Sequence, residues 1–495
     1  MNCTVLGTIR NDVLFQDNNT KPNRNVMVFG GPGSYKTQAY TITNVFAETE
    51  NSIVVTDTKG EVYESTVAVK IKQGYKPYVI NFTDMLHSNR YNPLDYINRD
   101  IDATKVANRI VESSAADAKK DVWFYSQRSL LKALILYVLY ETLPENRNLK
   151  GIAHFLQTYN PKLNDKGVSE LDLQFEKLDI DHPARLAYDL GFKQSEGEMR
   201  PSILMSLLTV ISDFVDREVG EFTSFSDFDL KDIGREKIIL YVIISAVDKT
   251  FENLANLFLS QLFEQLYIVG AENHAELPQA VSFIFEEFTN LGKFTNYEEF
   301  LATCRGYGIG VSTVCQSLTQ LQDKYGVKKA ESILGNCAVK ICLNSANKET
   351  SKYFSELLGK ATVKVETGSQ SVSKSDRESH SKSDSYSYTS RALMNPDEIE
   401  RMPPNEAIII FSNKRPLKVN KAFQFKLFAG ADSNKQNQTE YVGEPDPRQL
   451  EIFEQKTSEF KGRKGREEAI VSDAENYLNS LMEEEFPLEL FPDIK

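Results

Sequence analysis

An apolar run that ends in a glycine-rich turn, VMVFGGPGSYKT at residues 26–37, constrains the fold of this chain more than any other segment. The run has strand character and leads to a turn whose small residues let backbone N–H groups converge on an anion. A helix that begins at the turn adds the positive end of its dipole. Lys36 would reach the phosphates of a nucleotide, and Thr37 would place a hydroxyl on Mg²⁺. The segment therefore predicts a phosphate-binding loop.

The loop predicted to hold the phosphates consists of Gly30, Gly31, Pro32, Gly33, Ser34, Tyr35, Lys36 and Thr37. Tyr35 stands where such loops have a glycine directly before the lysine. Its side chain must point away from the phosphates, or nucleotide binding is weakened. The alternative for this segment is a glycine-rich turn that caps a helix and binds nothing.

The composition is that of an ordinary soluble globular protein of 495 residues, long enough for two or three domains. The net charge of −13 means that any contact with nucleic acid must come from a local basic patch. The five cysteines lack C-x-x-C spacing and indicate reduced core thiols in a cytosolic protein. The longest apolar stretch, from Leu130 to Tyr140, contains Lys132 and predicts a core helix rather than a membrane span.

Strand-like runs alternate with amphipathic segments from Val26 onward, which predicts β-α-β units and a parallel sheet. From about residue 100 to 227 the periodicity is helical. Strand candidates resume with KIILYVIIS, AVSFIF, IGVSTVC and VKICL. We therefore predict an α/β fold with a discontinuous nucleotide-binding domain, residues 1–98 and 229–430, into which an all-α domain, 99–228, is inserted.

The serine-rich segment 366–391 is predicted to form a mobile loop or ribbon, because it cannot bury a core. Residues 431–495 are predicted to form a polar, acidic C-terminal tail with a basic knot, KGRKGR, at 461–466. From residue 467 onward the tail favours a partner-docking peptide over a packed helix, because large apolar side chains interleave with its acids: Phe486, Leu488, Leu490 and Phe491. A merely solvated end is the alternative.

The run AVSFIFEEF supplies the second half of an ATPase site, an apolar strand that ends in two carboxylates. Glu286 is predicted to hold Mg²⁺, usually through water, and Glu287 to polarise the attacking water. Aspartate is usual on the metal side, so Glu286 is a second departure from the common pattern. The alternative is a helix start whose acids favour the dipole.

Phosphoryl transfer also needs a cation on the phosphate oxygens and a polar sensor of the γ-phosphate. Arg305 lies 18 residues after Glu287, where an arginine at a loop edge could serve a neighbouring subunit. Gln316 lies 11 residues further, at the end of the strand candidate IGVSTVC. Taken singly, each residue is better explained as an ordinary surface arginine or a glutamine in a turn.

In this order and spacing, the chain resembles the TraG/TraD-type coupling ATPases of type IV secretion and conjugation systems, relatives of the FtsK/HerA DNA pumps. The similarity covers roughly residues 5–425. It rests on the sequence motifs LGTIRN, VFGGPGSYKT, SIVVTDTKGEVYEST, YNPLDYI, FIFEEFTNLGKF, CRGYGIGVSTVCQSLTQL, YFSELLGKATV and LMNPDEIERMPPNEAIIIF.

This resemblance implies a RecA-like P-loop ATPase domain with an all-α insertion, a hexameric ring, and ATP and Mg²⁺ as ligands. The implied catalytic residues are Lys36, Glu287, Arg305 as an arginine finger and Gln316 as the sensor, with Thr37 and Glu286 at the metal. The motif with Asp57, Lys59 and Glu61 has a role that is structural or substrate-linked.

The implied function is to bring relaxase-bound single-stranded DNA, or protein substrates, to a secretion channel at the expense of ATP. The implied partners are the channel ATPase and membrane components, which would place the chain in the cytoplasm, peripheral at the inner face of the cell membrane. Family members usually begin with transmembrane helices before the position of LGTIRN, and this sequence has none there. We therefore expect a shortened chain or a variant that partners recruit to the membrane.

Two alternatives follow from the same residues. Tyr35 and Glu286 put strong hydrolysis in doubt, so the rival function is a docking adaptor with an ATPase fold and a weakened site. The other alternative, a chromosome-partition pump of the FtsK type, is disfavoured by the motifs TDTKGE and NLGKF.

Overall fold

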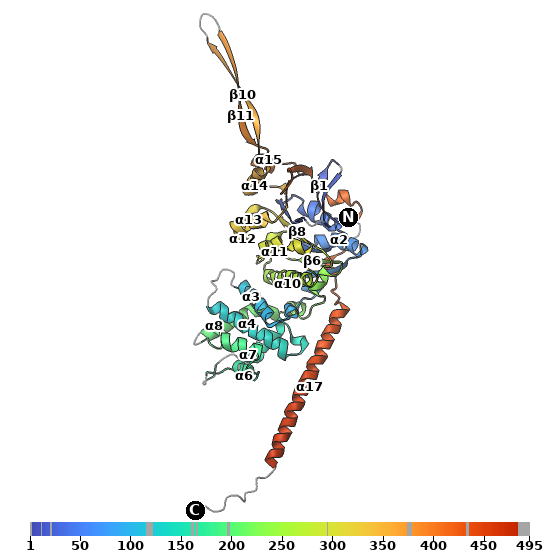
Figure 1. The fold of residues 1–495 in the computed structure, drawn as a ribbon, viewed down its shortest axis with the longest axis vertical. Helices are drawn as coiled ribbons and strands as arrows, with labels where there is room; N and C mark the ends of the chain where they lie inside the picture. The colour runs from blue at the N-terminus through green and yellow to red at the C-terminus, as the bar shows by residue number, and fades with distance from the viewer. Residues whose placement is uncertain are drawn as a thin grey trace, which may run out of the picture. The chain divides into compact units, whose positions relative to one another are not determined.

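The computed structural model of this chain describes residues 2–10, 12–19, 22–114, 122–159, 163–164, 167–195, 199–294, 296–373, 379–431 and 435–483. The chain divides into two compact units (Figure 1). The first consists of Met1–Asn89 and Asp229–Gly443, and the second of Arg90–Phe228 and Glu444–Lys495. The segment after Gly443 groups with the helical unit.

An eleven-stranded sheet forms the centre of the described part of the first unit, in the order β2-β1-β13-β12-β9-β3-β8-β7-β4-β6-β5. Neighbouring strands from β9 to β5 in this order are parallel, and the remaining pairs are antiparallel. The strands are β1 (Cys3–Ile9), β2 (Asp12–Asp17), β3 (Val26–Gly30), β4 (Ser52–Asp57), β5 (Lys76–Asn81), β6 (Ile238–Ile243), β7 (Val281–Phe285), β8 (Ile309–Cys315), β9 (Val339–Asn344), β12 (Glu406–Phe411) and β13 (Leu417–Asn420).

The parallel sheet predicted from the apolar runs is confirmed, and each strand candidate became a strand. Strands β3 and β4 are buried along their whole length, as expected for parallel strands covered on both faces. The hairpin β1–β2 was not anticipated. Its residues are mixed in polarity and no residue of β2 is fully buried, so the segment carries a weak strand signal.

Helices pack on both faces of this sheet (Figure 1). The α-helices of the first unit are α1 (Ile42–Ala47), α2 (Glu61–Lys72), α10 (Glu252–Glu272), α11 (Tyr297–Thr303), α12 (Leu318–Tyr325), α13 (Val327–Gly335), α14 (Lys348–Leu358), α15 (Pro396–Glu400) and α16 (Gln424–Leu427). Val45 of α1 and Val67 of α2 share one buried cluster with Val55 of β4. On β7, Ile284 joins this cluster, whereas its neighbour Phe283 packs on Phe263 of α10. Because successive strand residues face opposite sides, the sheet is covered on both faces.

The carboxyl ends of parallel strands meet at one edge of a sheet, where ligands bind in open α/β folds. Here that edge is formed by the ends of β3, β4, β7 and β8, at Gly30, Asp57, Phe285 and Cys315. The predicted phosphate loop follows β3, and the two glutamates follow β7. Gln316 follows β8, whereas Arg305 precedes it and lies toward the opposite edge.

Helices make up the described secondary structure of the second unit, so the predicted all-α domain is confirmed. These helices are α3 (Asp100–Ser114), α4 (Val122–Glu141), α5 (Leu149–Thr158), α6 (Glu170–Glu176), α7 (Pro183–Ala187), α8 (Met199–Ser212), α9 (Arg217–Phe222) and α17 (Pro447–Glu483). The apolar stretch from Leu130 to Tyr140 lies within α4, where its core positions are buried as predicted.

Helix α17 replaces the first part of the predicted tail, so residues 467–483 are helical, and their expected docking role stays a prediction. The basic knot lies on this helix, and Lys464 pairs with Glu141 of α4 at 3.0 Å from Nζ to Oε2. Glycines at 462 and 465 lower helix propensity and hide the helix in the sequence. The predicted apolar docking positions, Phe486, Leu488, Leu490 and Phe491, lie outside the described residues.

Of the two forms predicted for the serine-rich segment, the described residues adopt the ribbon. Strands β10 (Lys360–Ser373) and β11 (Ser379–Ala392) pair as a separate antiparallel sheet (Figure 1). The five cysteines are buried free thiols, as the composition predicts. None of the helices in the described ranges is long and apolar enough to cross a membrane.

Candidate functional site

The loop between β3 and the following helix can adopt its shape only with small residues at its first turn. A Cβ atom on Gly30 would lie 2.4 Å from Oγ of Ser34 and 2.9 Å from Cγ of Lys36. Gly33 has a φ of 72°, in the left-handed region that glycine adopts without strain. The chain then enters a π-helical turn, Thr37–Thr41, before α1. The sequence therefore folds here into a tight loop that opens a helix.

Tyr35 has a left-handed backbone, with a φ of 63°, although it carries a side chain. Such strain is concentrated at functional sites. The ring is 52% exposed and its edge packs on Phe423, with 5.6 Å between the ring centroids and an angle of 79°. The side chain that replaces the usual glycine is therefore held against Phe423.

Glu287 brings together three of the four residues predicted to be catalytic. Nζ of Lys36 lies 3.2 Å from Oε1 of Glu287 and donates to the carbonyl of Gly30 at 2.8 Å. Nε2 of Gln316 donates to Oε2 of Glu287 at 2.9 Å. Glu287 has a left-handed backbone, with a φ of 49°, at the turn that follows β7. This turn aims its carboxylate between the ends of β3 and β8.

The two residues predicted to hold Mg²⁺ are in direct contact, since Oγ1 of Thr37 donates to Oε1 of Glu286. Burial raises the pKa of Glu286 to about 8. The hydrogen bond from Thr37 opposes this shift, and the negative charges of Asp57 and Glu61 add to it. A buried carboxyl among other carboxylates beside a hydroxyl is a favourable place for a cation.

Asp57, in the TDTKGE motif, has a structural role. Its Oδ1 accepts from the backbone N–H groups of Lys59 at 3.1 Å and Gly60 at 2.8 Å. Its Oδ2 accepts from those of Val62 at 2.8 Å and Tyr63 at 3.0 Å. The carboxylate thus fixes the turn into α2. Burial raises the pKa of Asp57, against the effect of these four hydrogen bonds.

Arg305 is not part of this cluster. It lies on the turn Cys304–Tyr307, which is followed by the seven-residue strand β8, and its side chain is exposed. Such a strand spans roughly 20 Å. Since Gln316 is at the far end of β8, Arg305 lies too far away to reach the phosphate loop of its own chain.

Lys421 is a residue of this site that sequence reasoning missed. Its buried Nζ donates to the carbonyl of Ser34 at 3.0 Å, across 387 positions of sequence. Burial lowers the pKa of Lys421 to about 8. No local pattern identifies a lysine directly after β13 as a support of the phosphate loop.

The loop residues fit a phosphate group. Oγ of Ser34 is buried and has no hydrogen-bond partner among the described residues, so it is available to an anion. The first N–H groups of the helix that begins at Lys36 have no acceptor within the helix. The cradle, the lysine and the Thr37–Glu286 pair thus suit a nucleotide with Mg²⁺.

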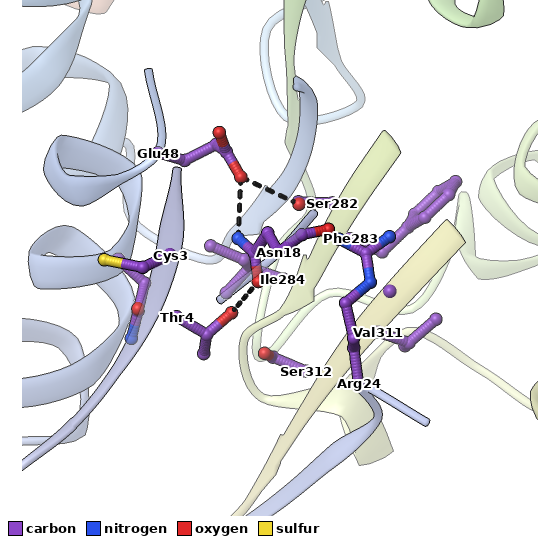
Figure 2. A pocket seen from close by; sticks show the side chains of 12 residues that line it. Cys3, Thr4, Asn18, Arg24, Glu48, Ser282, Phe283, Ile284, Val311 and Ser312 are labelled. Atoms are coloured by element: carbon purple, nitrogen blue, oxygen red, sulfur yellow. Dashed lines mark hydrogen bonds between the residues drawn. The ribbon is translucent and has the colours of Figure 1, made fainter. Parts of the chain in front are cut away.

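A small polar cavity lies toward the opposite edge of the sheet (Figure 2). It holds about 20 Å³, enough for one water molecule and far too little for a nucleotide. Buried Glu48 accepts there from Nδ2 of Asn18 at 2.8 Å and from Oγ of Ser282 at 3.2 Å (Figure 2). Arg24, also in its lining, donates to the carbonyl of Gly308 at 2.7 Å and so braces the turn that carries Arg305.

The chain is similar to proteins of conjugation. It is 26% identical over 373 residues to the conjugal transfer protein TraG of Escherichia coli, covering 71% of this chain and 58% of the relative. It is 28% identical over 226 residues to the protein VirD4 of Rhizobium radiobacter, covering 44% of this chain and 32% of the relative. The chain thus spans somewhat over half the length of the TraG relative.

Among solved structures, the fold is similar to that of the bacterial conjugative coupling protein TrwBdeltaN70 in its unbound form. The TM-score is 0.60 at 17% identity, over 87% of this chain and 90% of that one. TrwB in complex with ADP and Mg²⁺ gives a TM-score of 0.57 at 17% identity, over 85% and 88% of the two chains. This likeness confirms the predicted fold, a RecA-like domain with an inserted all-α domain.

A family profile described as type IV secretory system conjugative DNA transfer matches residues 6–477, which is nearly the whole chain. The protein therefore belongs to the conjugative DNA transfer family of the type IV secretory system.

Proposed function

We propose that this chain is a coupling ATPase, which hydrolyses ATP to bring relaxase-bound single-stranded DNA, or protein substrates, into a type IV secretion or conjugation channel. The family supports conjugative DNA transfer as the process, and the residues at the phosphate-loop edge of the sheet support ATP hydrolysis as the chemistry. The observation that carries the proposal is the meeting of Lys36 and Gln316 on Glu287, because these side chains come from the ends of three different strands.

Lys36 has two contacts that the phosphates of ATP would replace. It would leave the Gly30 carbonyl and Glu287 and contact the β- and γ-phosphates. Glu287 would then be free to orient the attacking water and accept its proton. Gln316 already donates to Glu287 and so lies where it can respond to the γ-phosphate. The ion pair thus keeps the carboxylate of Glu287 bound to Lys36 until a nucleotide displaces the lysine.

Thr37 and Glu286 would hold Mg²⁺, the hydroxyl directly and the carboxylate directly or through water. Bound Mg²⁺ would offset the negative charge of the phosphates. TrwB has been solved in complex with ADP and Mg²⁺ and with non-hydrolysable analogues of ATP and GTP, which supports ATP and Mg²⁺ as ligands here.

Arg305 would act on the ATP of a neighbouring copy, since it lies away from the loop of its own chain. An arginine supplied in trans stabilises charge in the transition state of phosphoryl transfer. A closed ring places each finger on the next site, so we propose a homo-hexamer as the active form.

The proposed cargo and partners follow from the family. The relatives are called conjugal transfer proteins, which supports DNA with its relaxase as cargo and the channel ATPase and membrane components as partners. We place the protein in the cytoplasm, peripheral at the inner face of the membrane. With a net charge of −13, it would grip the DNA backbone through local lysines and arginines.

A docking adaptor that binds nucleotide and hydrolyses little is the second candidate. It is favoured by the strained Tyr35 in the loop and by Glu286, which stands where aspartate is usual. A motor and an adaptor differ in turnover, because only the motor should release phosphate faster when DNA is present.

The test is phosphate release with and without single-stranded DNA, for the wild type, Lys36→Ala and the control Lys324→Ala. Lys324 lies in the same unit and pairs with Glu252 at 2.7 Å, away from the loop. We expect Lys36→Ala to lower the rate by about 10²–10³, because it removes a cation from the transition state. Lys324→Ala should keep the wild-type rate. Equal rates for Lys36→Ala and the wild type would refute the assignment, and a slow rate unmoved by DNA would favour the adaptor.

A further inference from the structure

Three aromatic side chains gather beside the phosphate loop and form what we call the aromatic platform: Tyr35, Phe423 and Phe425. Phe423 is the buried centre, 8% exposed, with Tyr35 edge-on at 5.6 Å and Phe425 stacked at 5.2 Å and 29°. The two outer rings are 52% and 49% exposed. The platform therefore offers two large apolar rings to solvent directly next to Lys36.

The platform is fastened to the loop and to its helix. Lys421 donates to the carbonyl of Ser34 in the loop at 3.0 Å. Oγ1 of Thr43 donates to the carbonyl of Ala422 at 2.7 Å. These bonds tie the segment after β13 to the helix that follows the phosphate loop, so the position of Phe423 and Phe425 is set by the loop itself.

We propose that the aromatic platform binds the base of the nucleotide whose phosphates the loop holds. This inference rests on the proposed nucleotide binding and adds the base subsite to it. A nucleotide held at Lys36 must place its sugar and base beside the loop, and the exposed rings of Tyr35 and Phe425 lie there. The strained backbone of Tyr35 supports this role, because a glycine would relieve the strain but provide no ring.

Stacking also determines which nucleotides would bind. Every base has a π-face, so an aromatic platform holds bases with little discrimination among them. Lys426, 5.3 Å from the centre of the Phe423 ring, adds positive charge at the rim, and buried Lys421 lies 5.9 Å from the centre of the Tyr35 ring. The substrate class is therefore nucleoside triphosphates, with ATP and GTP bound within about threefold of each other.

The experiment compares MgATP with magnesium tripolyphosphate, which has the phosphates and no base, by titration calorimetry. Phe425→Ala removes an exposed ring, and Phe15→Ala, which removes a ring that is 52% exposed on β2, is the matched control. We expect Phe425→Ala to weaken MgATP about five- to tenfold and to leave tripolyphosphate unchanged. Phe15→Ala should change neither affinity.

Unchanged MgATP affinity in Phe425→Ala would overturn the proposed base binding. The same result is expected if the rings bind a protein partner instead. An equal loss for MgATP and tripolyphosphate would also overturn it, because the ring would then only support the loop. Lys36→Ala separates this inference from the proposed function: it should weaken both ligands, and no change in either would refute the phosphate loop itself.

A second measurement uses Phe425→Trp, since the chain has one other tryptophan, Trp123, in the second unit. A base stacked on the new indole should quench its fluorescence. MgATP and MgGTP should quench to a similar extent, and tripolyphosphate should not. Quenching by tripolyphosphate but not by the nucleotides would contradict stacking on this residue. The absence of quenching by a nucleotide that calorimetry shows to bind would contradict it as well.

Discussion

Replacing Glu287 by Gln should make ATP bind more tightly while stopping its hydrolysis. In the structure, Glu287 pairs with Lys36 at 3.2 Å, and Lys36 also donates to the Gly30 carbonyl. ATP must break this pair before the lysine reaches the phosphates. Glu287→Gln keeps the size of the side chain and its contact with Gln316 but removes the charge that competes for the lysine.

The magnitude follows from the geometry. Two unit charges 3.2 Å apart attract by about 5 kcal/mol at an effective dielectric constant of 20. Only part of this would appear as affinity, because Glu287 is 16% exposed to screening water and Lys36 keeps its bond to Gly30. A third of the attraction, about 1.7 kcal/mol, corresponds to roughly 15- to 20-fold tighter binding of ATP. The rate constant should fall by about 10²–10⁴, because the water loses its base.

The assay is a pair of measurements on one protein preparation, MgATP affinity by calorimetry and phosphate release by a coupled assay. Glu252→Gln is the matched control, since it discharges another lysine–glutamate pair, with Lys324 at 2.7 Å, in the same unit. It should change neither quantity. Weaker ATP binding in Glu287→Gln would refute the reasoning, because it would show that the carboxylate helps to hold the nucleotide instead of competing for Lys36.

Two further predictions concern other residues. Arg305→Ala should lower hydrolysis while leaving ATP affinity within about twofold of the wild type, because the finger acts in the transition state. Mixing it with Lys36→Ala should restore some activity through mixed interfaces, and no rescue in a mixture proven to co-assemble would contradict action in trans. Lys70→Met should flatten the dependence of stability on pH, because burial lowers the pKa of Lys70 from 10.5 to about 7. Between these values the unfolded chain binds a proton that the folded chain does not, so wild-type stability should rise by roughly 2 kcal/mol from pH 7 to pH 9. Thermal unfolding at several pH values measures this, and parallel curves for the two proteins would contradict it.

The parts of the site that could be predicted are those with a local signal. The glycines before Lys36 and the carboxylates after a fully apolar strand follow rules of chain geometry within a few residues. Their meeting could also be predicted, because parallel strands bring their carboxyl ends to one edge. Gln316 joined Glu287 for the same reason, as the residue that directly follows β8.

What could not be predicted depends on contacts between distant segments. Lys421 reaches the loop only because β13 pairs with β1 and β12, and no local pattern encodes that pairing. Helix α17 was hidden by its glycines and charges, since half-buried side chains such as Phe453 and Phe460 are too few to give a clear helical period. The TDTKGE motif was found, but only the four N–H groups around Asp57 show that this residue fixes the turn into α2.

Arg305 precedes strand β8 and Gln316 follows it, so one strand connects the two parts of the proposed mechanism. Strand β8 is buried along all seven residues and is held on both sides by the parallel strands β3 and β7. A strand so enclosed does not bend freely, so Gln316 at one end and the turn with Arg305 at the other are parts of one rigid element. Arg24, two residues before the start of β3, donates to the carbonyl of Gly308, which ends the same turn. If Arg305 completes a neighbour's site, two adjacent strands connect the loop that binds one ATP to the turn that acts on the next. Hydrolysis by this chain should then require assembly, because no single copy contains all the groups that the chemistry needs.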